Sequence, residues 1–403
     1  MAIAGVIAEY NPFHRGHAWQ LRTIRNQLNA AAVVVVMSGS FTQRGGPAVT
    51  DKWSRAKAAL ENGADLVLEL PVPYAVASAQ YFAAAGVALL SACGIVTHLC
   101  FGTESPSLAP LQKALAATEA PDFPLRLRRH LRTGLSYAAA TAQAWEEGGL
   151  AAGEDGARLT APNNLLGLEY LRALRAQNSA LIPVAIPRPD NDADPTALTG
   201  LPSATAIRHA IAAAPSPLPL SPEVAAALPD KTLAEAFAQG RGPVFAPDFS
   251  APLFYRLRTL SPAQLKEAGG FPEGLENRVL AALPACSDWE ELCAALTSRR
   301  YPRATIRRCL CRVLLDCGAP LGAPAYLRVL GFRKDAASLL GSLAREAALP
   351  VLTNPGRQLP GLSPAAQALF SREVRATDIY GMACQSPALR KRGLDFTQPL
   401  VQL

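Results

Sequence analysis

Aromatic residues are scarce in this 403-residue chain, at 6% of the sequence, and methionine occurs only three times. None of the eight cysteines forms a CxxC pair, so the paired spacing typical of a zinc site is missing. No apolar run is long and uncharged enough to span a bilayer, and the chain begins as a strand rather than as a secretion signal. We therefore expect a cytoplasmic protein with structural thiols, no metal centre and no membrane span.

What the chain does contain is a large apolar fraction. Hydrophobic residues make up 50% of it and charged residues 18%, which indicates a globular protein of two or three domains. The net charge of +7 permits nucleic-acid binding without demanding it. This charge is unevenly distributed, because residues 299–334 include nine basic residues and one acid, Asp316.

The first 214 residues alternate between two kinds of pattern. Apolar segments typical of buried strands lie at residues 3–8, 31–37, 65–70, 97–101 and 181–186. Helical patterns lie between them, at residues 16–29, 52–62, 75–93 and 164–177. This alternation predicts an α/β, Rossmann-like domain with a parallel sheet covered on both faces. Such sheets bind ligands at the carboxyl ends of their strands.

A proline-rich stretch at residues 214–222 predicts a domain boundary, with an N-terminal domain at 1–214 and a mainly helical, basic region at 215–403. Helices are expected in that region at residues 223–228, 232–239, 276–282, 289–296 and 303–316. A shorter α/β piece is expected to hold residues 326–331 and 350–353. The segment 305–316 predicts an amphipathic basic helix with Arg308 and Arg312 on one face.

The turn after the first strand leads into His14-Arg15-Gly16-His17, at the start of the first predicted helix. Histidines three residues apart share one face of a helical turn, where free N–H groups and the helix dipole also favour an anion. Ring donors held there would stabilise the charge that builds on an α-phosphate under attack. We therefore predict that His14 and His17 are catalytic and that Gly16 keeps the backbone open. The alternative is a pair of surface or capping histidines.

A second candidate segment, residues 203–208, begins a predicted helix. Ser203 or Thr205 could cap this helix or donate to a phosphate, and Arg208 could reach the β- and γ-phosphates. Taken alone, the segment is also an ordinary capping sequence. Together with the HxGH pattern it predicts the second half of an adenylyl-transfer site.

Further candidates lie close to predicted strand ends. Gly102 ends a strand, Asn163 opens a helix and could read an adenine edge or a ribose, and Arg188 could pair with a phosphate. The segment after the second strand, with the start of the next helix, suits a small anion or second substrate; its candidate contacts are Ser38, Gly39, Gln43, Arg44 and Lys52. A solvated loop and helix face is the alternative for this segment.

These motifs also carry a family resemblance. The strings involved are residues 9–17, 37–39, 43–45, 47–48, 52–53, 65–71, 101–102, 162–164 and 203–208. They resemble the bacterial tRNA(Met) cytidine acetate ligases, of the HxGH nucleotidyltransferase superfamily. The resemblance is specific over residues 1–210 and continues more loosely to Asp378-Ile379-Tyr380.

The resemblance implies a reaction in two steps. Acetate attacks the α-phosphate of ATP, with Mg²⁺ expected beside the nucleotide, and the acetyl group then passes to N4 of the wobble cytidine of elongator tRNA(Met). The ATP contacts it implies are Ile7, Ala8, Glu9, Tyr10, Asn11, Pro12, Phe13, His14, Gly16, His17, Gln20, Gly102, Asn163 and Arg188. One departure from the family pattern is the acidic stretch at 189–195, whose three aspartates would repel a triphosphate unless Mg²⁺ or distance intervenes.

The basic segment would then hold the tRNA through its phosphates. The expected contacts are Arg299, Arg300, Arg303, Arg307, Arg308 and Arg312. Tyr301, Phe332 and Tyr380 are the candidate platforms for unstacked bases, and a solvated arginine-rich helix is the alternative. Two other functions stay open. A small-molecule adenylyltransferase would leave the basic region unexplained, and a non-catalytic nucleotide- or tRNA-binding module would not need a complete α-phosphate site.

Overall fold

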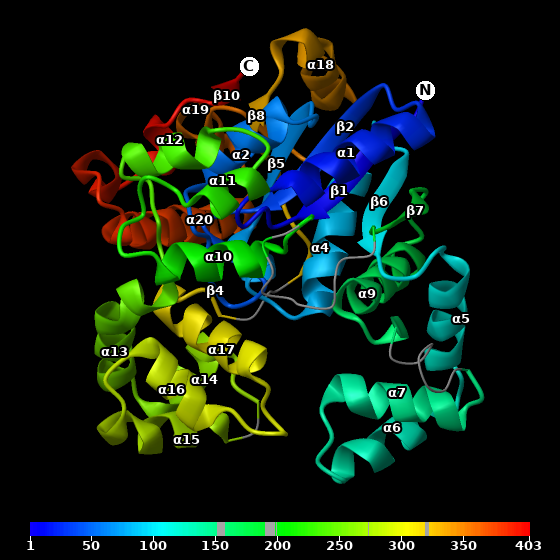
Figure 1. Ribbon diagram of the computed structural model, residues 1–403, viewed down its shortest axis with the longest axis vertical. Helices are drawn as coiled ribbons and strands as arrows, with labels where there is room; N and C mark the ends of the chain where they lie inside the picture. The colour runs from blue at the N-terminus through cyan, green and yellow to red at the C-terminus, as the bar shows by residue number, and fades with distance from the viewer. Residues whose placement is uncertain (151–157, 190–197, 199, 273, 319–321) are drawn as a thin grey trace.

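One sheet organises the molecule, as the computed structural model shows (Figure 1). The structure describes residues 1–150, 158–189, 198, 200–272, 274–318 and 322–403. The strand order is β10-β8-β5-β2-β1-β6-β7, with β9 paired to β8. These strands are β1 (Ile3–Ala8), β2 (Ala32–Ser38), β5 (Leu66–Leu70), β6 (His98–Thr103), β7 (Ile182–Pro187), β8 (Leu327–Phe332), β9 (Val351–Leu352) and β10 (Val401–Gln402). The predicted α/β class and the mostly parallel sheet are confirmed.

The central strand β2 shows why the sheet is covered on both faces. Its side chains alternate in direction, and all are buried. Val34 and Val36 join a core cluster with α4 (Ala79–Ala92) and α9 (Pro162–Ala176), whereas Val33 and Val35 pack with α1 (Arg15–Leu28) and α2 (Lys52–Glu61). The predicted segments match these elements to within two residues, except that the predicted helix 75–93 divides into α3 (Val72–Ala75) and α4.

The remaining helices extend the molecule beyond the sheet. The described residues between β6 and α9 include α5 (Ala109–Thr118), α6 (Phe123–Arg132) and α7 (Tyr137–Glu147). The later helices are α10 (Ala204–Ala213), α11 (Pro222–Ala227), α12 (Thr232–Ala238), α13 (Ser250–Thr259), α14 (Pro262–Gly269), α15 (Leu275–Ala282), α16 (Trp289–Leu296), α17 (Arg303–Leu315), α18 (Ala337–Glu346), α19 (Pro355–Gln358), α20 (Pro364–Ala383) and α21 (Leu394–Thr397). The short 3₁₀ helices are η1 (Ala246–Phe249), η2 (Leu283–Ala285), η3 (Lys334–Ala336), η4 (Leu359–Gly361) and η5 (Pro387–Arg390).

The sheet uses strands from both sides of the boundary predicted at residue 214. Strand β8 runs antiparallel beside β5, with Leu66 opposite Phe332 and Glu69 opposite Arg328, and β10 then pairs with β8. Without β8, the apolar strand β5 would be an open sheet edge, which proteins generally avoid. The division into 1–214 and 215–403 stays a prediction about domains, but the sheet itself crosses it.

Two expectations about the chain as a whole can be checked in the structure. All eight cysteines are buried and carry free thiols, as expected of structural residues. Among the residues that the structure describes, no helix is both long and apolar enough to cross a membrane.

Candidate active site

Four loops meet at the carboxyl edge of the sheet. They follow β1, β2, β6 and β7, which run parallel to one another and are neighbours in the strand order. Their first residues after the strands include Glu9, Gly39, Glu104 and Arg188. This edge is where parallel α/β sheets bind ligands, and most of the predicted site residues lie here.

The HxGH turn holds its two histidine rings through the start of α1. His14 is the N-cap residue, and its Nδ1 accepts a hydrogen bond from the Gly16 amide at 3.0 Å. His17 Nδ1 accepts in turn from the His14 amide at 3.3 Å. Because each Nδ1 is an acceptor, the proton of each neutral ring is on Nε2. The histidines do cap the helix, and this capping fixes the orientation of both Nε2–H donors. The centroids of the two imidazole rings are 3.8 Å apart.

Both rings are neutral at pH 7. Burial, together with the positive charges of Arg188 and Arg208, lowers the pKa of His14 to about 3. Burial also lowers the pKa of His17 well below its ordinary value, with contributions from His14 and Arg188. The rings of Tyr10 and Phe13 pack against His17 at centroid distances of 4.8 and 5.5 Å. The site therefore offers fixed, uncharged donors, which suit charge that develops only during reaction.

Arg208 lies next to this turn and close to Arg44, Arg307 and Glu9. Its Nη1 donates to the Asn11 carbonyl at 2.5 Å, and its Nη2 donates to Thr205 Oγ1 at 3.2 Å. Arg44 Nη1 donates to the same hydroxyl at 3.1 Å. Burial lowers the pKa of Arg208 to about 10, and repulsion from Arg44 and Arg307 contributes. We call Arg44, Arg188, Arg208 and Arg307 the arginine cluster; a bound polyanion would relieve its repulsion.

Ser203 caps helix α10, which carries Arg208. Its Oγ accepts from the Ala206 amide at 3.1 Å, so the capping alternative for this residue is observed. The cap starts the helix so that Thr205 and Arg208, three residues apart, share one face. Segment 203–208 thus places Arg208 against the HxGH turn, and its contact with a phosphate stays a prediction.

The other predicted ATP contacts gather around β6. A Cβ placed on Gly102 would lie 3.5 Å from Gln20 Nε2 and 3.7 Å from Arg188 Cγ, so these three residues are neighbours. The side-chain nitrogen Nδ2 of Asn163 donates to Glu104 Oε1 at 2.6 Å. The backbone N–H of Asn164 donates to the same carboxylate at 2.9 Å.

The sequence analysis missed the roles of Glu104 and Asn164. Glu104 ties the end of β6 to the start of α9, and the side chain of Asn164 accepts from the Glu104 and Ser105 amides at 3.0 and 3.3 Å. Asn164 is completely buried. The signal in the sequence was the second asparagine of Pro162-Asn163-Asn164, which is too polar for a buried helical position unless it is bonded there.

The apolar members of the predicted ATP segment are core residues. Ile7, Tyr10, Pro12 and Phe13 are buried, so they can meet a nucleotide through the backbone rather than through an exposed side chain. Ala8 is half-buried at the end of β1. Glu9 accepts from the Gln43 amide at 2.9 Å and thereby joins the turn after β1 to the loop after β2.

Arg55 clamps these two loops more strongly. Its Nη1 donates to the Glu9 carbonyl at 2.6 Å and to the Ser38 carbonyl at 3.0 Å, and its Nη2 donates to the Gly39 carbonyl. Its Nε donates to the Thr50 carbonyl at 3.2 Å. The side chain is 1% exposed, and burial lowers its pKa. Arg55 is therefore a scaffold residue, because its donors are used by the backbone of the site.

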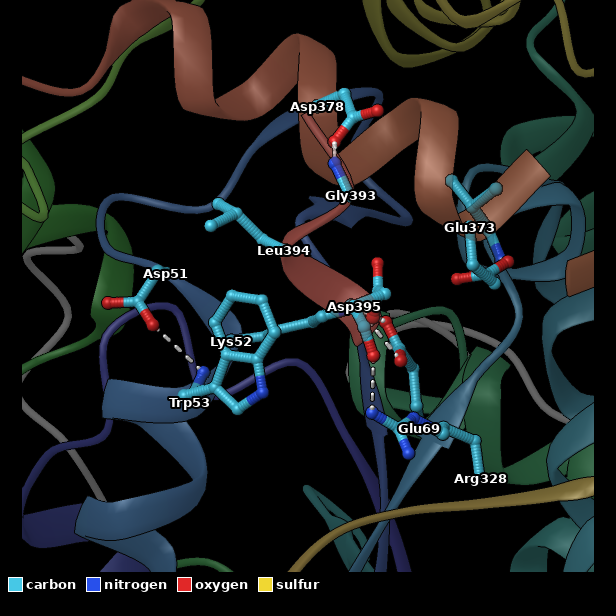
Figure 2. A network of polar contacts seen from close by, with 12 residues as sticks. Asp51, Lys52, Trp53, Glu69, Arg328, Glu373, Asp378, Gly393, Leu394 and Asp395 are labelled. Carbon is cyan, nitrogen blue, oxygen red and sulfur yellow. Dashed lines mark hydrogen bonds and ion pairs between the residues drawn. The ribbon is translucent and has the colours of Figure 1, made fainter. Parts of the chain in front are cut away.

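Lys52 does not lie where the sequence analysis placed it. Figure 2 shows its side chain pointing toward Glu69 and Asp395, and its Nζ is 2.7 Å from a carboxylate oxygen of each. The residue is fully buried. The prediction that its ammonium group contacts a second substrate is wrong. Asp51 caps α2 and turns Lys52 inward, toward an acid 343 residues away that local sequence could not reveal.

The loop after β2 rests on helix α17. A short hairpin, β3 (Phe41–Thr42) and β4 (Gly46–Pro47), brings Gly45 against the backbone of Arg307 and Arg308. Gly45 has φ +75°, and a Cβ there would lie 2.3 Å from Arg308 N. The contact requires glycine both for its backbone conformation and for its close approach.

We expect Gly45→Ala to lower the free energy of unfolding by about 1–3 kcal/mol, because the new methyl group meets backbone that cannot move aside. Denaturant unfolding measures this change. The matched control is Gly46→Ala, whose Cβ would meet the flexible end of Arg307 at 3.0 Å, and it should cost less. Equal stability of both variants would contradict the described packing of the loop on α17.

The predicted tRNA-binding arginines fall into two groups. Arg299, Arg300 and Arg303 are exposed, and Arg307 and Arg308 are partly buried. Arg303 and Arg307 both pair with Glu290, the latter at 2.7 Å. Arg312 is only 9% exposed, and its Nη1 donates to the Gly269 carbonyl at 3.5 Å.

Arg312 is therefore too buried to contact tRNA phosphates together with Arg308, and the prediction that it does so is wrong. Helix α17 buries most of its surface among α13, α14, α16 and α20, which leaves little of it to solvent. Two of the proposed aromatic platforms are wrong for the same reason: Tyr301 is 6% exposed and Tyr380 is 2% exposed. Phe332 is half-buried in β8 and packs against the core.

Two points concern charge near a nucleotide. Most of the acidic stretch 189–195 lies outside the described residues. Within the part of the chain that is described, no group of three or more His, Cys, Asp or Glu side chains could hold a metal ion.

Comparisons with known proteins show which family the chain resembles. Residues 1–394 match the model of the family described as HIGH Nucleotidyl Transferase. The chain is 36% identical to the tRNA(Met) cytidine acetate ligase of Acetivibrio thermocellus, with 100% of both chains covered. It is also 36% identical to the protein of that name in Syntrophomonas wolfei, with 98% of each covered. A crystal structure of Thermotoga maritima TmcAL bound with alpha-thio ATP covers the whole chain at 29% identity, with a TM-score of 0.89.

Proposed function

Because the chain belongs to the HIGH nucleotidyl transferases, and within them to the tRNA(Met) cytidine acetate ligases, we propose that it uses ATP to join acetate to a cytidine of tRNA(Met). The acceptor is N4 of the wobble cytidine in elongator tRNA(Met), and the product is N4-acetylcytidine. The enzyme works in the cytoplasm, where it meets its tRNA. The observation that carries the proposal is the pair of Nε2–H donors on His14 and His17 beside the arginine cluster.

In the first step an acetate oxygen attacks the α-phosphorus of ATP. The bond from this phosphorus to the bridging oxygen breaks, so pyrophosphate leaves and acetyl-adenylate remains. His14 and His17 donate to the α-phosphate oxygens, whose negative charge grows in the transition state. Arg208, with Arg44 and Arg188, neutralises the β- and γ-phosphates of the leaving group. Ser203 and Thr205 contribute by fixing Arg208 on its helix.

Magnesium would enter this site with the nucleotide. Mg²⁺ keeps several of its waters and is usually held by substrate phosphates with one or two carboxylates, rather than by a complete protein cage. The described residues include no group of three or more His, Cys, Asp or Glu side chains that could hold a metal ion by themselves. Glu9 is the carboxylate of the turn after β1 and the residue that could contribute.

The second step transfers the acetyl group. The amine N4 of cytidine attacks the acetyl carbonyl carbon, AMP leaves with the electrons of the carbon–oxygen bond, and N4 gives up a proton. The end of β2 at Ser38 and the loop after it, with Gly39, Gln43 and Arg44, lie between the ATP turn and α17 and would accommodate acetate. The exposed arginines 299, 300 and 303, with Arg307 and Arg308, would hold tRNA phosphates.

The test is a reconstituted reaction of the purified protein with ATP, labelled acetate and elongator tRNA(Met). The full mixture should yield AMP, pyrophosphate and acetylated cytidine, and omission of any substrate should abolish the last product. A tRNA with uridine at the wobble position is the matched control, because uridine lacks the N4 amine. Transfer of AMP to a small acceptor would instead indicate a small-molecule adenylyltransferase, and absence of any turnover would indicate a binding module; either result overturns the proposal.

A further inference from the structure

Helix α6 and the start of α7 form a basic surface that the site described above does not use. Between residues 123 and 145 the chain carries four arginines and one histidine but no acidic residue. Arg128, Arg129 and Arg132 are exposed. Arg128 and Arg132 are four residues apart on one helix, where like charges destabilise the helix slightly. A surface that keeps such repulsion fits an anionic partner.

Local acids neutralise only part of this surface. Arg126 pairs with Asp122 at 3.2 Å, and Arg129 pairs with Glu147 at 2.6 Å. Arg128 and Arg132 have no ion-pair partner among the residues that the structure describes. These two guanidinium groups, one helical turn apart, match the spaced phosphates of a nucleic-acid backbone better than they match a single small anion.

An exposed aromatic ring lies on the same hairpin. Tyr137 begins α7, directly after the turn that follows α6, and is 55% exposed. Rings that stand in solvent are typical platforms for unstacked RNA bases. The rings that the sequence suggested for this role, Tyr301 and Tyr380, are buried. Tyr137 is therefore the better candidate for contact with a loop of single-stranded RNA.

The position of the hairpin supports this role. In Figure 1, α6 and α7 extend from the same end of the molecule as α15, α16 and α17, and the β4 and α10 region of the candidate site lies above them. The hairpin is connected to the site through α5 and α9, and Asn163 lies in the first turn of α9.

We propose that the α6–α7 hairpin is a docking surface for the anticodon arm of the tRNA, with Arg128 and Arg132 on backbone phosphates and Tyr137 stacked on an unpaired base. This proposal rests on the proposed function and adds a second surface to the arginines of residues 299–308. Within the hairpin, the two arginines contribute the salt-dependent part of the affinity for tRNA, and the ring of Tyr137 contacts the anticodon loop.

The test measures binding of elongator tRNA(Met) to the full-length protein over a range of salt concentrations. Arg128→Ala with Arg132→Ala should weaken binding about tenfold and flatten the salt dependence by roughly two phosphate contacts. The matched control removes two other exposed arginines, Arg345→Ala with Arg357→Ala on α18 and α19, and should leave both quantities unchanged. Arg128→Lys with Arg132→Lys should restore the salt dependence, and circular dichroism checks that each variant is folded.

Tyr137 provides an independent measurement. Tyr137→Ala should weaken tRNA binding about tenfold without changing its salt dependence, because it removes stacking but no charge. Tyr137→Phe keeps the ring and should retain the affinity of the unaltered protein. If the arginine pair and Tyr137→Ala bind as the unaltered protein does, or if the arginines prove necessary for binding anionic phospholipid vesicles and not tRNA, the hairpin proposal is overturned.

Failure of the proposed function would appear differently. Acetate-dependent exchange of pyrophosphate into ATP by the unaltered protein tests acetate activation without tRNA. Absence of this exchange would reject the ligase proposal whatever the hairpin does. Exchange together with unchanged tRNA binding by the hairpin variants would reject the docking surface alone.

Discussion

Replacing His14 or His17 by alanine should lower kcat for acetyl-adenylate formation by about 100- to 1000-fold for each ring. Each ring has one donor left for a substrate, its Nε2–H, because Nδ1 accepts a backbone hydrogen bond. Loss of one preorganised donor to a developing oxyanion typically has an effect of this size. Pyrophosphate release in single-turnover experiments with acetate and ATP measures it directly.

A capping role alone predicts a different outcome. Asparagine is among the best N-cap residues, so His14→Asn should preserve the start of α1 while it removes the ring donor. We expect this variant to be nearly as stable as the original protein and almost as inactive as His14→Ala. His209, an exposed histidine on α10, is the control, and His209→Ala should leave the rate unchanged. If His14→Asn keeps most of the activity, the ring has only a capping role.

The pH dependence provides a further check on the same prediction. Because the pKa of His14 is about 3 in the folded protein, this ring stays neutral from pH 8 down to pH 5. The rate of adenylate formation should therefore show no inflection near the ordinary histidine pKa of about 6.5 that His14→Asn removes. An inflection that disappears in this variant would mean that the ring works as a charged acid rather than as a neutral donor.

Lys52→Met should be the most destabilising substitution considered, with a loss of about 3–5 kcal/mol at pH 8. The ammonium group is the nearest cation to Glu69 and Asp395 and lowers the pKa of Asp395 despite the burial of that carboxylate (Figure 2). The third acid of this cluster, Glu373, has its pKa raised by burial and by Glu69. Without Lys52, buried negative charge would lose its main partner.

The sign of the pH effect distinguishes this mechanism from a simple packing defect. In Lys52→Met the buried carboxylates should have raised pKa values and bind protons that the unfolded chain releases. Stability then falls as pH rises, so the deficit relative to the unaltered protein should be smaller at pH 5 than at pH 8. Denaturant unfolding at both pH values measures this, and a deficit that does not change with pH would contradict the charge cluster.

A lysine on the same helix provides the control. Lys57 pairs with Glu235 at 2.8 Å, but its side chain is 37% exposed, so Lys57→Met should cost less than about 1 kcal/mol. The experiment also decides between the two roles considered for Lys52. A stable Lys52→Met protein with a raised KM for acetate would restore the substrate contact expected from the sequence and would contradict the buried arrangement.

The sequence alone predicted the strands of the sheet and most of the helices between them. An unbroken valine run such as residues 33–36 is typical of a buried strand, because β-branched residues favour strands. The HxGH turn after β1 is a local feature whose spacing suffices to recognise it. The elements it missed include α5, α6 and α7, of which α5 and α7 lie in alanine-rich segments whose apolar residues have little helical periodicity. Those segments could be located only once their neighbours were known.

What sequence decided by itself is the chemistry at each loop: two histidines, a capped Arg208 and a basic C-terminal region. Only the tertiary structure decided which charges reach a ligand. It buries Lys52 and Arg312, exposes Arg128 and Arg132, and converts Arg55 into a clamp for the backbone. The physical reason is that a charged side chain can contact a ligand only where its burial and its partners within the protein leave it free to do so. Those partners, like Asp395 for Lys52, come from elements hundreds of residues away.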